Sequence, residues 1–168
     1  YHGVTRGPDE AVPRLVETLA REPTHMLAHS LGGLVALEAL RQHPELPVQR
    51  VVCMGSPLRG SNAVHGMLQR SWAAATLGRS ADLLERGFDK WNGHAEVGVI
   101  AGTVPHGLGH VFGGFEGEHD GSVAVEETRL PGLTDHAVIA ASHSGMLFSA
   151  EAARLAIAFF RRGTFHSP

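Results

Sequence analysis

The stretch that decides the fold is THMLAHSLGGLVALEAL, residues 24–40, in which two apolar runs flank the polar pair His29-Ser30. The first run has the length of a short buried strand, and the second has the length of a helix that is apolar on nearly every side. A serine at this junction would lie on a sharp turn between strand and helix. Such a turn lifts the hydroxyl clear of the strand, where a base can reach it.

The residues around Ser30 fit this kind of turn. Its cramped backbone requires small residues two positions before and two positions after the serine, which here are Ala28 and Gly32. The backbone N–H of Leu31 would then lie at a helix N-terminus, where developing negative charge is favoured. We therefore predict that Ser30 is a nucleophile and that Leu31 is an oxyanion donor. The alternative is a serine that caps an ordinary helix.

The rest of the chain alternates helix and strand patterns. Apolar spacing predicts helices over residues 9–23, with Asp9 as the cap, 31–44 and 150–163, and weaker helical patterns over 62–93. Apolar and β-branched runs predict strands over residues 24–29, 48–55, 95–102 and 136–142. Strands that alternate with helices are typical of a mostly parallel sheet covered on both faces. The sequence thus predicts an α/β fold, and its 168 residues predict a single domain.

Composition excludes several classes of function. With 14 basic and 17 acidic residues, the chain has no electrostatic basis for binding nucleic acid or an anionic membrane surface. No apolar run approaches the ~18 residues that a membrane span needs. The single cysteine, Cys53, lies in an apolar run and is expected to be buried. A cytoplasmic location is favoured, but the chain starts at Tyr1 and not at methionine, so a leader ahead of it is compatible with the sequence.

A serine nucleophile of this kind needs an acid and then a histidine further along the chain. Asp120 lies at an Asp-Gly turn, and His143 follows the last predicted strand. Both fall where strands end, at the edge of a parallel sheet where ligands bind. Asp135 is a competing acid, but a strand of roughly 26 Å would hold it at the far edge of the sheet. Glu116 and Glu118 are further alternatives, because the loop before Asp120, residues 107–121, is long.

The twelve histidines raise the alternative of a metal site. His106 and His110 are four positions apart, with His119 and Asp120 close by, and imidazole with carboxylate is a set that binds zinc. This spacing has no helical meaning in a glycine-rich loop, so we expect solvated histidines and neither a metal nor a cofactor. We expect His29 to be held by local hydrogen bonds rather than to act as a base, because neighbours on a tight turn point apart.

Four blocks in order resemble the esterases and lipases of the α/β-hydrolase fold, in particular the bacterial group related to triacylglycerol lipases. They are AHSLGGLVALEAL, VVCMGSPLRGSNAV, HDGSVAVEET and SHSGMLFS, and they span the chain from about residue 24 to its end. The resemblance implies a carboxylic ester hydrolase that acts on a small-molecule or lipid ester, with no cofactor. It implies Ser30 as nucleophile, Asp120 as acid and His143 as general base, in agreement with the reasoning from strand ends.

The resemblance also implies where substrate would bind. Pro57 and Leu58, after the strand that carries Cys53, would line the pocket. Residues 62–93 would form a helical cap over the acyl site, with Leu68 and Trp72 among the residues that contact substrate. This cap would be part of the one α/β-hydrolase domain that spans residues 1–168.

The beginning of the chain departs from the family. Such proteins begin with further strands and a His-Gly loop that completes the oxyanion hole, whereas here His2-Gly3 lies too close to Ser30 for those elements to intervene. We therefore expect the N-terminal strands of the family to be missing, which would leave the strand over residues 24–29 as an exposed edge able to pair with another chain. Two alternatives to an esterase remain: an inactive remnant that acts as a binding protein, and a metal-dependent hydrolase that uses the histidine loop.

Overall fold

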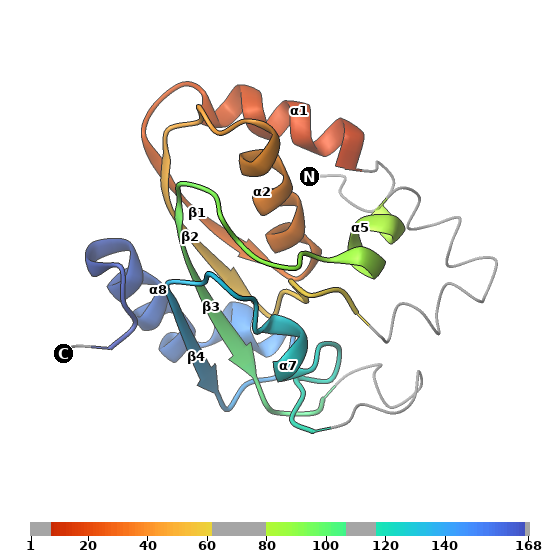
Figure 1. Ribbon diagram of the computed structural model, residues 1–168. Coiled ribbons are helices and arrows are strands. Elements are labelled where there is room, and N and C mark those ends of the chain that lie inside the picture. The colour runs from red at the N-terminus through yellow and green to blue at the C-terminus, as the bar shows by residue number, and fades with distance from the viewer. Residues whose placement is uncertain (1–7, 62–79, 107–116, 167–168) are drawn as a thin grey trace.

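The computed structural model is a parallel β-sheet between layers of helices, and it describes residues 8–61, 80–106 and 117–166 (Figure 1). The strands are β1 (Thr24–His29), β2 (Val48–Met54), β3 (Glu96–Gly102) and β4 (Asp135–Ile139). The helices are α1 (Pro8–Leu19), α2 (Leu31–Gln42), α5 (Ser80–Arg86), α7 (Val125–Thr128), the 3₁₀ helix η1 (Gly145–Phe148) and α8 (Ala150–Arg162).

The strands lie in the order β1-β2-β3-β4, and every neighbouring pair is parallel. The register places His29 opposite Met54 and Met54 opposite Ile100. Because the four strands in the described part of the chain run in one direction, their carboxyl ends lie along a single edge of the sheet. The predicted α/β fold with a mostly parallel sheet is therefore confirmed.

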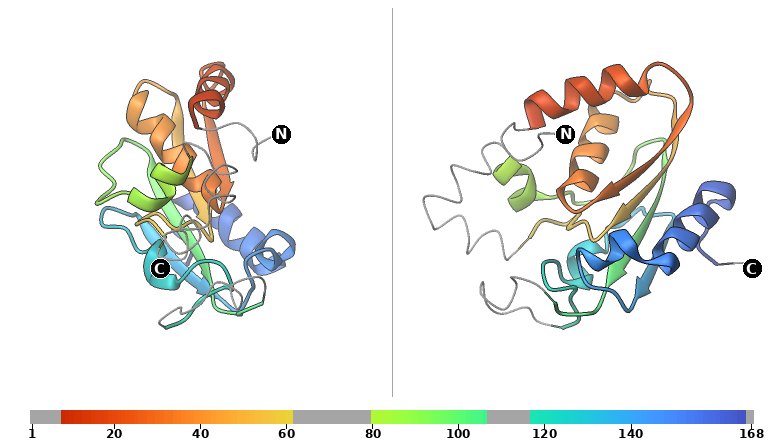
Figure 2. Two further views of the ribbon diagram at one scale, coloured as in Figure 1. Left: turned by 90° about the vertical axis from the view of Figure 1, so that its right-hand side faces the viewer. Right: turned by 180° about the vertical axis from the view of Figure 1, so that it is seen from behind.

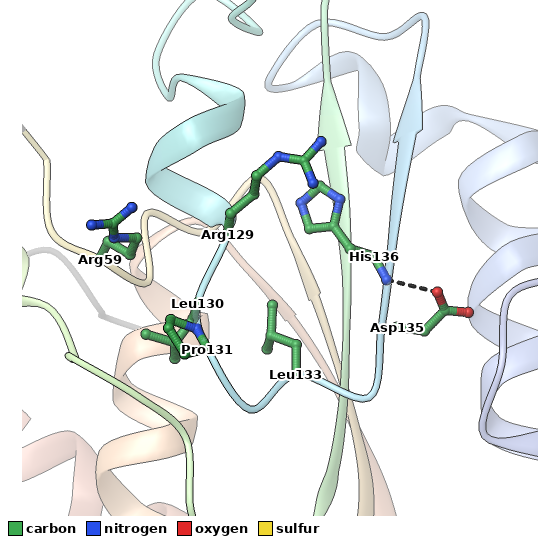
Figure 3. Close-up of a pocket in the computed structure, with 7 residues that line it drawn as sticks. All are labelled: Arg59, Arg129, Leu130, Pro131, Leu133, Asp135 and His136. Atoms are coloured by element: carbon green, nitrogen blue, oxygen red, sulfur yellow. Dashed lines mark hydrogen bonds between the residues drawn. The ribbon is translucent and has the colours of Figure 1, made fainter.

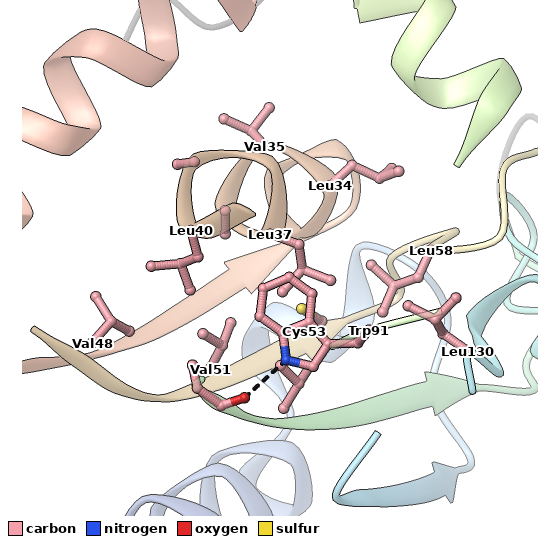
Figure 4. Close-up of a cluster of buried hydrophobic side chains, with 14 of the residues drawn as sticks. Leu34, Val35, Leu37, Leu40, Val48, Val51, Cys53, Leu58, Trp91 and Leu130 are labelled. Carbon is pink, nitrogen blue, oxygen red and sulfur yellow. Dashed lines mark hydrogen bonds between the residues drawn. The ribbon is translucent and has the colours of Figure 1, made fainter. Parts of the chain in front are cut away.

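Helices cover both faces of the sheet, with α2 on one face and α8 on the other (Figure 2). Helix α2 is buried at every residue from Gly33 to Leu40, as expected for a helix that is apolar on nearly every side. Its leucines pack with α1 and with side chains of β2 such as Val51 and Cys53 (Figure 4). Burial of one such leucine contributes about 1.5–3 kcal/mol. Cys53 is fully buried, as predicted, and burial raises the pKa of its thiol to about 12.

Helix α8 closes the opposite face with one apolar side. Phe159 is fully buried and packs against Phe165, with ring centroids 5.0 Å apart. At the start of the helix the Ser149 hydroxyl accepts a hydrogen bond from the N–H of Ala152 at 3.2 Å. At its end Gly163 takes φ 77°, a left-handed conformation that favours glycine. The predicted helix over residues 150–163 is thus confirmed, with Gly163 as its C-cap.

Some predicted boundaries differ from the structure. Helix α1 begins at Pro8, so Asp9 lies in its first turn and does not cap it. Strand β4 covers Asp135–Ile139 and ends three residues before the predicted limit, because the chain turns after Ile139. Of the predicted cap over residues 62–93, only residues 80–93 lie among those described, and they contain α5.

Strand β1 forms one edge of the sheet in the part of the chain that the structure describes, since it pairs there with β2 alone. Leu27 on this strand is 55% exposed. Residues 1–7 lie outside the described part, so both the missing strands and the pairing of this edge with another chain stay predictions. No helix within residues 8–61, 80–106 and 117–166 is long and apolar enough to cross a membrane.

Candidate active site

Ser30 occupies the turn between β1 and α2 with φ 56° and ψ −130°. A positive φ in a residue with a side chain costs of order 1–3 kcal/mol and persists only where its surroundings enforce it. Here the N–H of Ser30 donates to the carbonyl of Met54 at 2.9 Å, and its own carbonyl accepts from the N–H of Gly33 at 3.1 Å. The end of β2 and the first turn of α2 together hold the serine in this conformation.

The closest packing at this turn falls at Gly33 rather than at Gly32. A Cβ atom on Gly33 would overlap the hydroxyl of Ser56, which is itself fully buried. A Cβ atom on Gly32 would lie 3.9 Å from the Cβ of Ala28, an ordinary van der Waals contact. The two small residues of the motif, Ala28 and Gly32, thus face each other at this turn, and Gly33 is a further position with no room for a side chain, which the motif did not indicate.

The imidazole of His143 lies between Ser30 and Asp120. Its Nε2 is 3.0 Å from the Oγ of Ser30, and its Nδ1 is 2.8 Å from the Oδ2 of Asp120. The backbone N–H of His143 also donates to the carbonyl of Asp120 at 2.9 Å. Each residue lies on a segment beyond the carboxyl end of a strand: Ser30 follows β1, Asp120 follows β3 and His143 follows β4. The structure thus brings together the three residues that sequence reasoning selected for nucleophile, acid and base.

The carboxylate of Asp120 is 1% exposed and is fixed from two sides. Its Oδ1 accepts hydrogen bonds from the N–H groups of Ser122 and Val123 at 2.9 and 2.8 Å. The turn that supplies them passes through Gly121, whose φ of 98° favours glycine. Because the backbone holds Oδ1, Oδ2 is left facing the imidazole of His143.

Two glycines at strand ends make room for the Asp120–His143 pair, and the sequence analysis missed both. Gly55 follows β2 with φ 52°, and a Cβ atom there would lie 3.0 Å from Oδ2 of Asp120 and 3.1 Å from Nδ1 of His143. Gly102 ends β3, and a Cβ atom there would lie 3.0 Å from the Cβ of Asp120. The signal available in the sequence was a glycine at the end of each of two neighbouring apolar runs.

His29 also contacts the site, over a distance in sequence that we did not expect. Its Nε2–H donates to the backbone carbonyl of His143 at 3.0 Å, across 114 positions. The two rings lie 4.6 Å apart between centroids. Burial lowers the pKa of His29, and the hydrogen bond to His143 only partly offsets that effect. The prediction that a hydrogen bond holds His29 is confirmed, but the prediction that the bond is local is wrong.

Asp120, and none of the competing acids in the described part of the chain, is the carboxylate that bonds to His143. Asp135 begins β4, at the opposite end of that strand from His143. Burial raises the pKa of Asp135, but hydrogen bonds from the N–H of Phe165, the hydroxyl of Thr164 and the N–H of His136 outweigh it, so the net pKa is lowered. Glu118 is exposed, and Glu116 lies outside the described residues.

The residues predicted to bind substrate have different surroundings. Leu31 is the first residue of α2, so its N–H has no acceptor within the helix. Pro57 is buried, and Leu58 is fully buried in the core beneath α2 (Figure 4), which places its side chain in the protein interior rather than on an open pocket wall. Leu68 and Trp72 lie outside the described residues.

The structure describes only part of the loop that contains His106, His110 and His119. His110 lies outside the described residues, and the Nδ1 of His119 accepts the N–H of Gly121 at 3.2 Å. The carboxylate of Asp120 faces His143 and backbone N–H groups instead of a histidine of this loop. Among the residues that the structure describes, no three potential metal ligands come together.

A separate hollow of about 370 Å³ lies elsewhere on the molecule (Figure 3). Asp135 and His136, at the amino end of β4, contribute to its wall, whereas the candidate active site lies beyond the carboxyl ends of the strands. The remaining lining residues are Arg59, Arg129, Leu130, Pro131 and Leu133. None of Ser30, Asp120 and His143 lines it, so this hollow is distinct from the candidate active site.

The parallel sheet and the strained serine between strand and helix define the class of an α/β hydrolase. A model of the α/β-hydrolase fold family matches residues 9–94, and the chain belongs to this family. Membership supports a hydrolase activity. A search of curated protein sequences gives no match to this chain.

Solved structures with the same fold include enzymes from several sources. The mature form of the lipase BlEst2 from Bacillus licheniformis is 21% identical, with a TM-score of 0.67 over 92% of this chain and 71% of that one. The α/β hydrolase MGS-MChE2, from the metagenome of lagoon sediments at Mar Chica in Morocco, is 20% identical, with a TM-score of 0.56 over 92% and 68%. The phospholipase PlaB from Legionella pneumophila, in complex with thio-NAD, is 16% identical, with a TM-score of 0.57 over 77% and 35%. At these identities the likeness concerns the fold alone.

Proposed function

We propose that this protein is a serine hydrolase that cleaves carboxylic esters through an acyl-enzyme. The observation that carries the proposal is the continuous line of contacts from the Ser30 hydroxyl through both nitrogens of His143 to Asp120, at 3.0 and 2.8 Å. A hydroxyl becomes an effective nucleophile when a base accepts its proton and a third group orients that base. Ser30, His143 and Asp120 have the geometry for these three roles.

In the proposed reaction, the Oγ of Ser30 attacks the ester carbonyl carbon while the Nε2 of His143 takes the hydroxyl proton. Negative charge develops on the carbonyl oxygen, and the N–H of Leu31 is suited to stabilise it at the start of α2. The tetrahedral intermediate expels the alcohol, which receives the proton from His143. Water activated by His143 then releases the acid, and Asp120 stabilises the imidazolium in both halves of the reaction.

The proposed substrate is a lipid or small-molecule ester. Lipase and phospholipase structures with this fold support the proposal at the level of the scaffold. We retain residues 62–93 as a proposed cap over the acyl chain, with Leu68 and Trp72 as proposed contacts. The Pro57-Leu58 segment, which is buried, would then support the site from below rather than touch substrate through Leu58.

Labelling with a fluorophosphonate probe tests the nucleophile. The probe should attach to the peptide that contains Ser30, and Ser30→Ala should lose both the label and ester turnover, the latter by about 10⁴-fold or more. Ser144→Ala is a matched control, because Ser144 is exposed and adjacent to His143 but makes no capping hydrogen bond through its side chain. It should keep both label and turnover.

Other outcomes would favour the alternatives to a serine esterase. Label on a residue other than Ser30, or label that persists in Ser30→Ala, would overturn the assignment of the nucleophile. A chain that neither labels nor turns over esters would support a binding protein without catalysis. Loss of turnover on treatment with a chelator, with no label at Ser30, would support a metal-dependent hydrolase.

A further inference from the structure

The backbone N–H and the backbone carbonyl of His143 both form hydrogen bonds to other parts of the site. The N–H of His143 donates to the carbonyl of Asp120 at 2.9 Å, and its carbonyl accepts from the Nε2–H of His29 at 3.0 Å. The first bond fixes the loop that carries His143 against the acid. The second fixes it against the residue that immediately precedes Ser30 in the chain. Each contact of the candidate triad thus has a backbone hydrogen bond beside it.

We propose that His29 is a positioning residue that sets the distance between the base and the nucleophile. Ser30 is covalently joined to His29, so a bond from the His29 side chain to the backbone of His143 limits how far Nε2 of His143 can move from Oγ of Ser30, now 3.0 Å away. This inference rests on the proposed serine hydrolase function. It assigns His29 a role that is separate from proton transfer, because its Nε2–H points at a carbonyl oxygen rather than at a reacting group.

The charge state of His29 suits this role. A carbonyl oxygen can only accept, so Nε2 of His29 carries the proton, and half-burial of the ring favours the neutral form. In the proposed reaction His143 becomes a cation, and the two rings are 4.6 Å apart between centroids. A lysine or arginine donor at position 29 would repel that cation, whereas a neutral imidazole donates a hydrogen bond without a charge.

Three variants separate positioning from packing. His29→Phe keeps a ring of similar size beside His143 but removes the donor, and we expect kcat to fall about tenfold with KM changed less than about twofold. His29→Gln replaces the ring with an amide whose Nε2–H can reach the same carbonyl, so it should restore kcat to within about threefold of the parent. His25→Phe is the matched control, since His25 lies on the same face of β1 but stacks on Phe160, 5.3 Å away between ring centroids.

Stability and spectroscopic measurements keep the result interpretable. Thermal unfolding of each variant gives the folded fraction, and kcat is expressed per folded molecule. Imidazole ¹⁵N spectra report the tautomer and hydrogen bonding of His143 without any turnover, and His29→Phe should shift those signals while His29→Gln and His25→Phe leave them near their parent positions. If the parent chain hydrolyses no ester, the proposed function fails, and the spectra still test the tie between His29 and His143.

Two results would overturn the positioning role. The first is His29→Phe with parental kcat per folded molecule and unshifted His143 signals, which would show that the hydrogen bond from His29 does not position His143. The second is His29→Gln with the same loss as His29→Phe, which would show that the donor is not what the site requires.

Discussion

Asp120 determines where the proton of His143 resides, because its two oxygens have different neighbours. The backbone N–H groups of Ser122 and Val123 require an acceptor at Oδ1, and only Oδ2 faces the imidazole. With a carboxylate there, Nδ1 of His143 donates and Nε2 is left as the acceptor that Ser30 needs.

Asp120→Asn should therefore reverse the tautomer. The remaining carbonyl oxygen is retained by the two backbone N–H groups, so the new NH₂ faces Nδ1, which must become an acceptor while Nε2 takes the proton. We expect turnover to fall by about 10⁴-fold with little change in fold. The measurements are ester turnover and circular dichroism, and a variant with near-parental kcat would show that another group serves as the acid.

Asp135→Asn is the counterpart and should affect stability only. Its oxygens accept from His136, Thr164 and Phe165, so an amide would place a donor against donors and lower the free energy of unfolding by about 1–2 kcal/mol. Turnover per folded molecule should not change, because Asp135 lies at the other end of β4 from His143. A large loss of kcat with parental stability would contradict this placement.

Ser30 and His143 could be chosen from the sequence because each comes soon after a strongly patterned strand, and Asp120 because it lies at an Asp-Gly turn between two such strands. The residues that shape their surroundings could not. A glycine at the end of an apolar run was the only local signal for Gly55 and Gly102, and it does not say which residues that glycine makes room for; the partner of His29 lies far away in the chain and left no local signal. Long-range packing is therefore the part of the site that required a structure.

In helix α2, the two adjacent glycines of the first turn, Gly32 and Gly33, have different neighbours. In an exposed helix, replacing glycine with alanine stabilises by up to about 1 kcal/mol. At Gly33 that gain competes with overlap between the new Cβ and the Ser56 hydroxyl, whereas Gly32 has room for a methyl group.

Gly33→Ala should lower the free energy of unfolding by about 1–3 kcal/mol, since the buried Ser56 cannot move without disturbing the core. Gly32→Ala is the matched control and should be neutral or slightly stabilising. Urea denaturation of the two variants beside the parent gives the comparison. Equal effects at the two positions would mean that the turn requires glycine for its backbone and not for space.

Helices of a single turn were not predictable, whereas the strands and the longer helices were. The runs that became α2, β2 and α8 extend over enough residues to show a period, and their predicted and observed limits nearly agree. Helices α7 and η1 have four residues each, too few for a helical period to appear. Strand β4 was predicted too long because the apolar residues Ala140 and Ala141 continue its pattern into the turn that leads to His143.

We expect the fold to be sensitive to acid because two of its histidines, His29 and His136, are half-buried. Burial lowers the pKa of both His29 and His136 below the value of 6.5 for an exposed histidine. The Nε2–H of His136 donates to the hydroxyl of Thr128 at 2.8 Å, and that hydroxyl donates to the carbonyl of Val125 at 2.6 Å. As pH falls below about 6.5, the unfolded chain binds protons that the folded chain resists, so stability decreases.

The free energy of unfolding should therefore be lower near pH 5.5 than near pH 7.5, and His136→Gln should reduce the difference. Glutamine retains a donor for Thr128 but removes the titrating ring. His94→Gln, at an exposed histidine, is the control and should leave the difference unchanged. Urea denaturation at the two pH values provides the test, and an identical pH dependence in His136→Gln and the parent would rule His136 out as a source of the acid sensitivity.

The parallel sheet affects when the candidate active site forms during folding. Parallel neighbours cannot form as hairpins, so each strand pairs only after a long connection has closed, and pairings of this kind form slowly. Ser30 and His143 are 113 positions apart, on segments that follow the first and the last strand of the sheet. During refolding, helices and individual strands can be present while the nucleophile still has no base. We therefore expect the Ser30–His143 contact to recover late in refolding, after the helices and individual strands have formed.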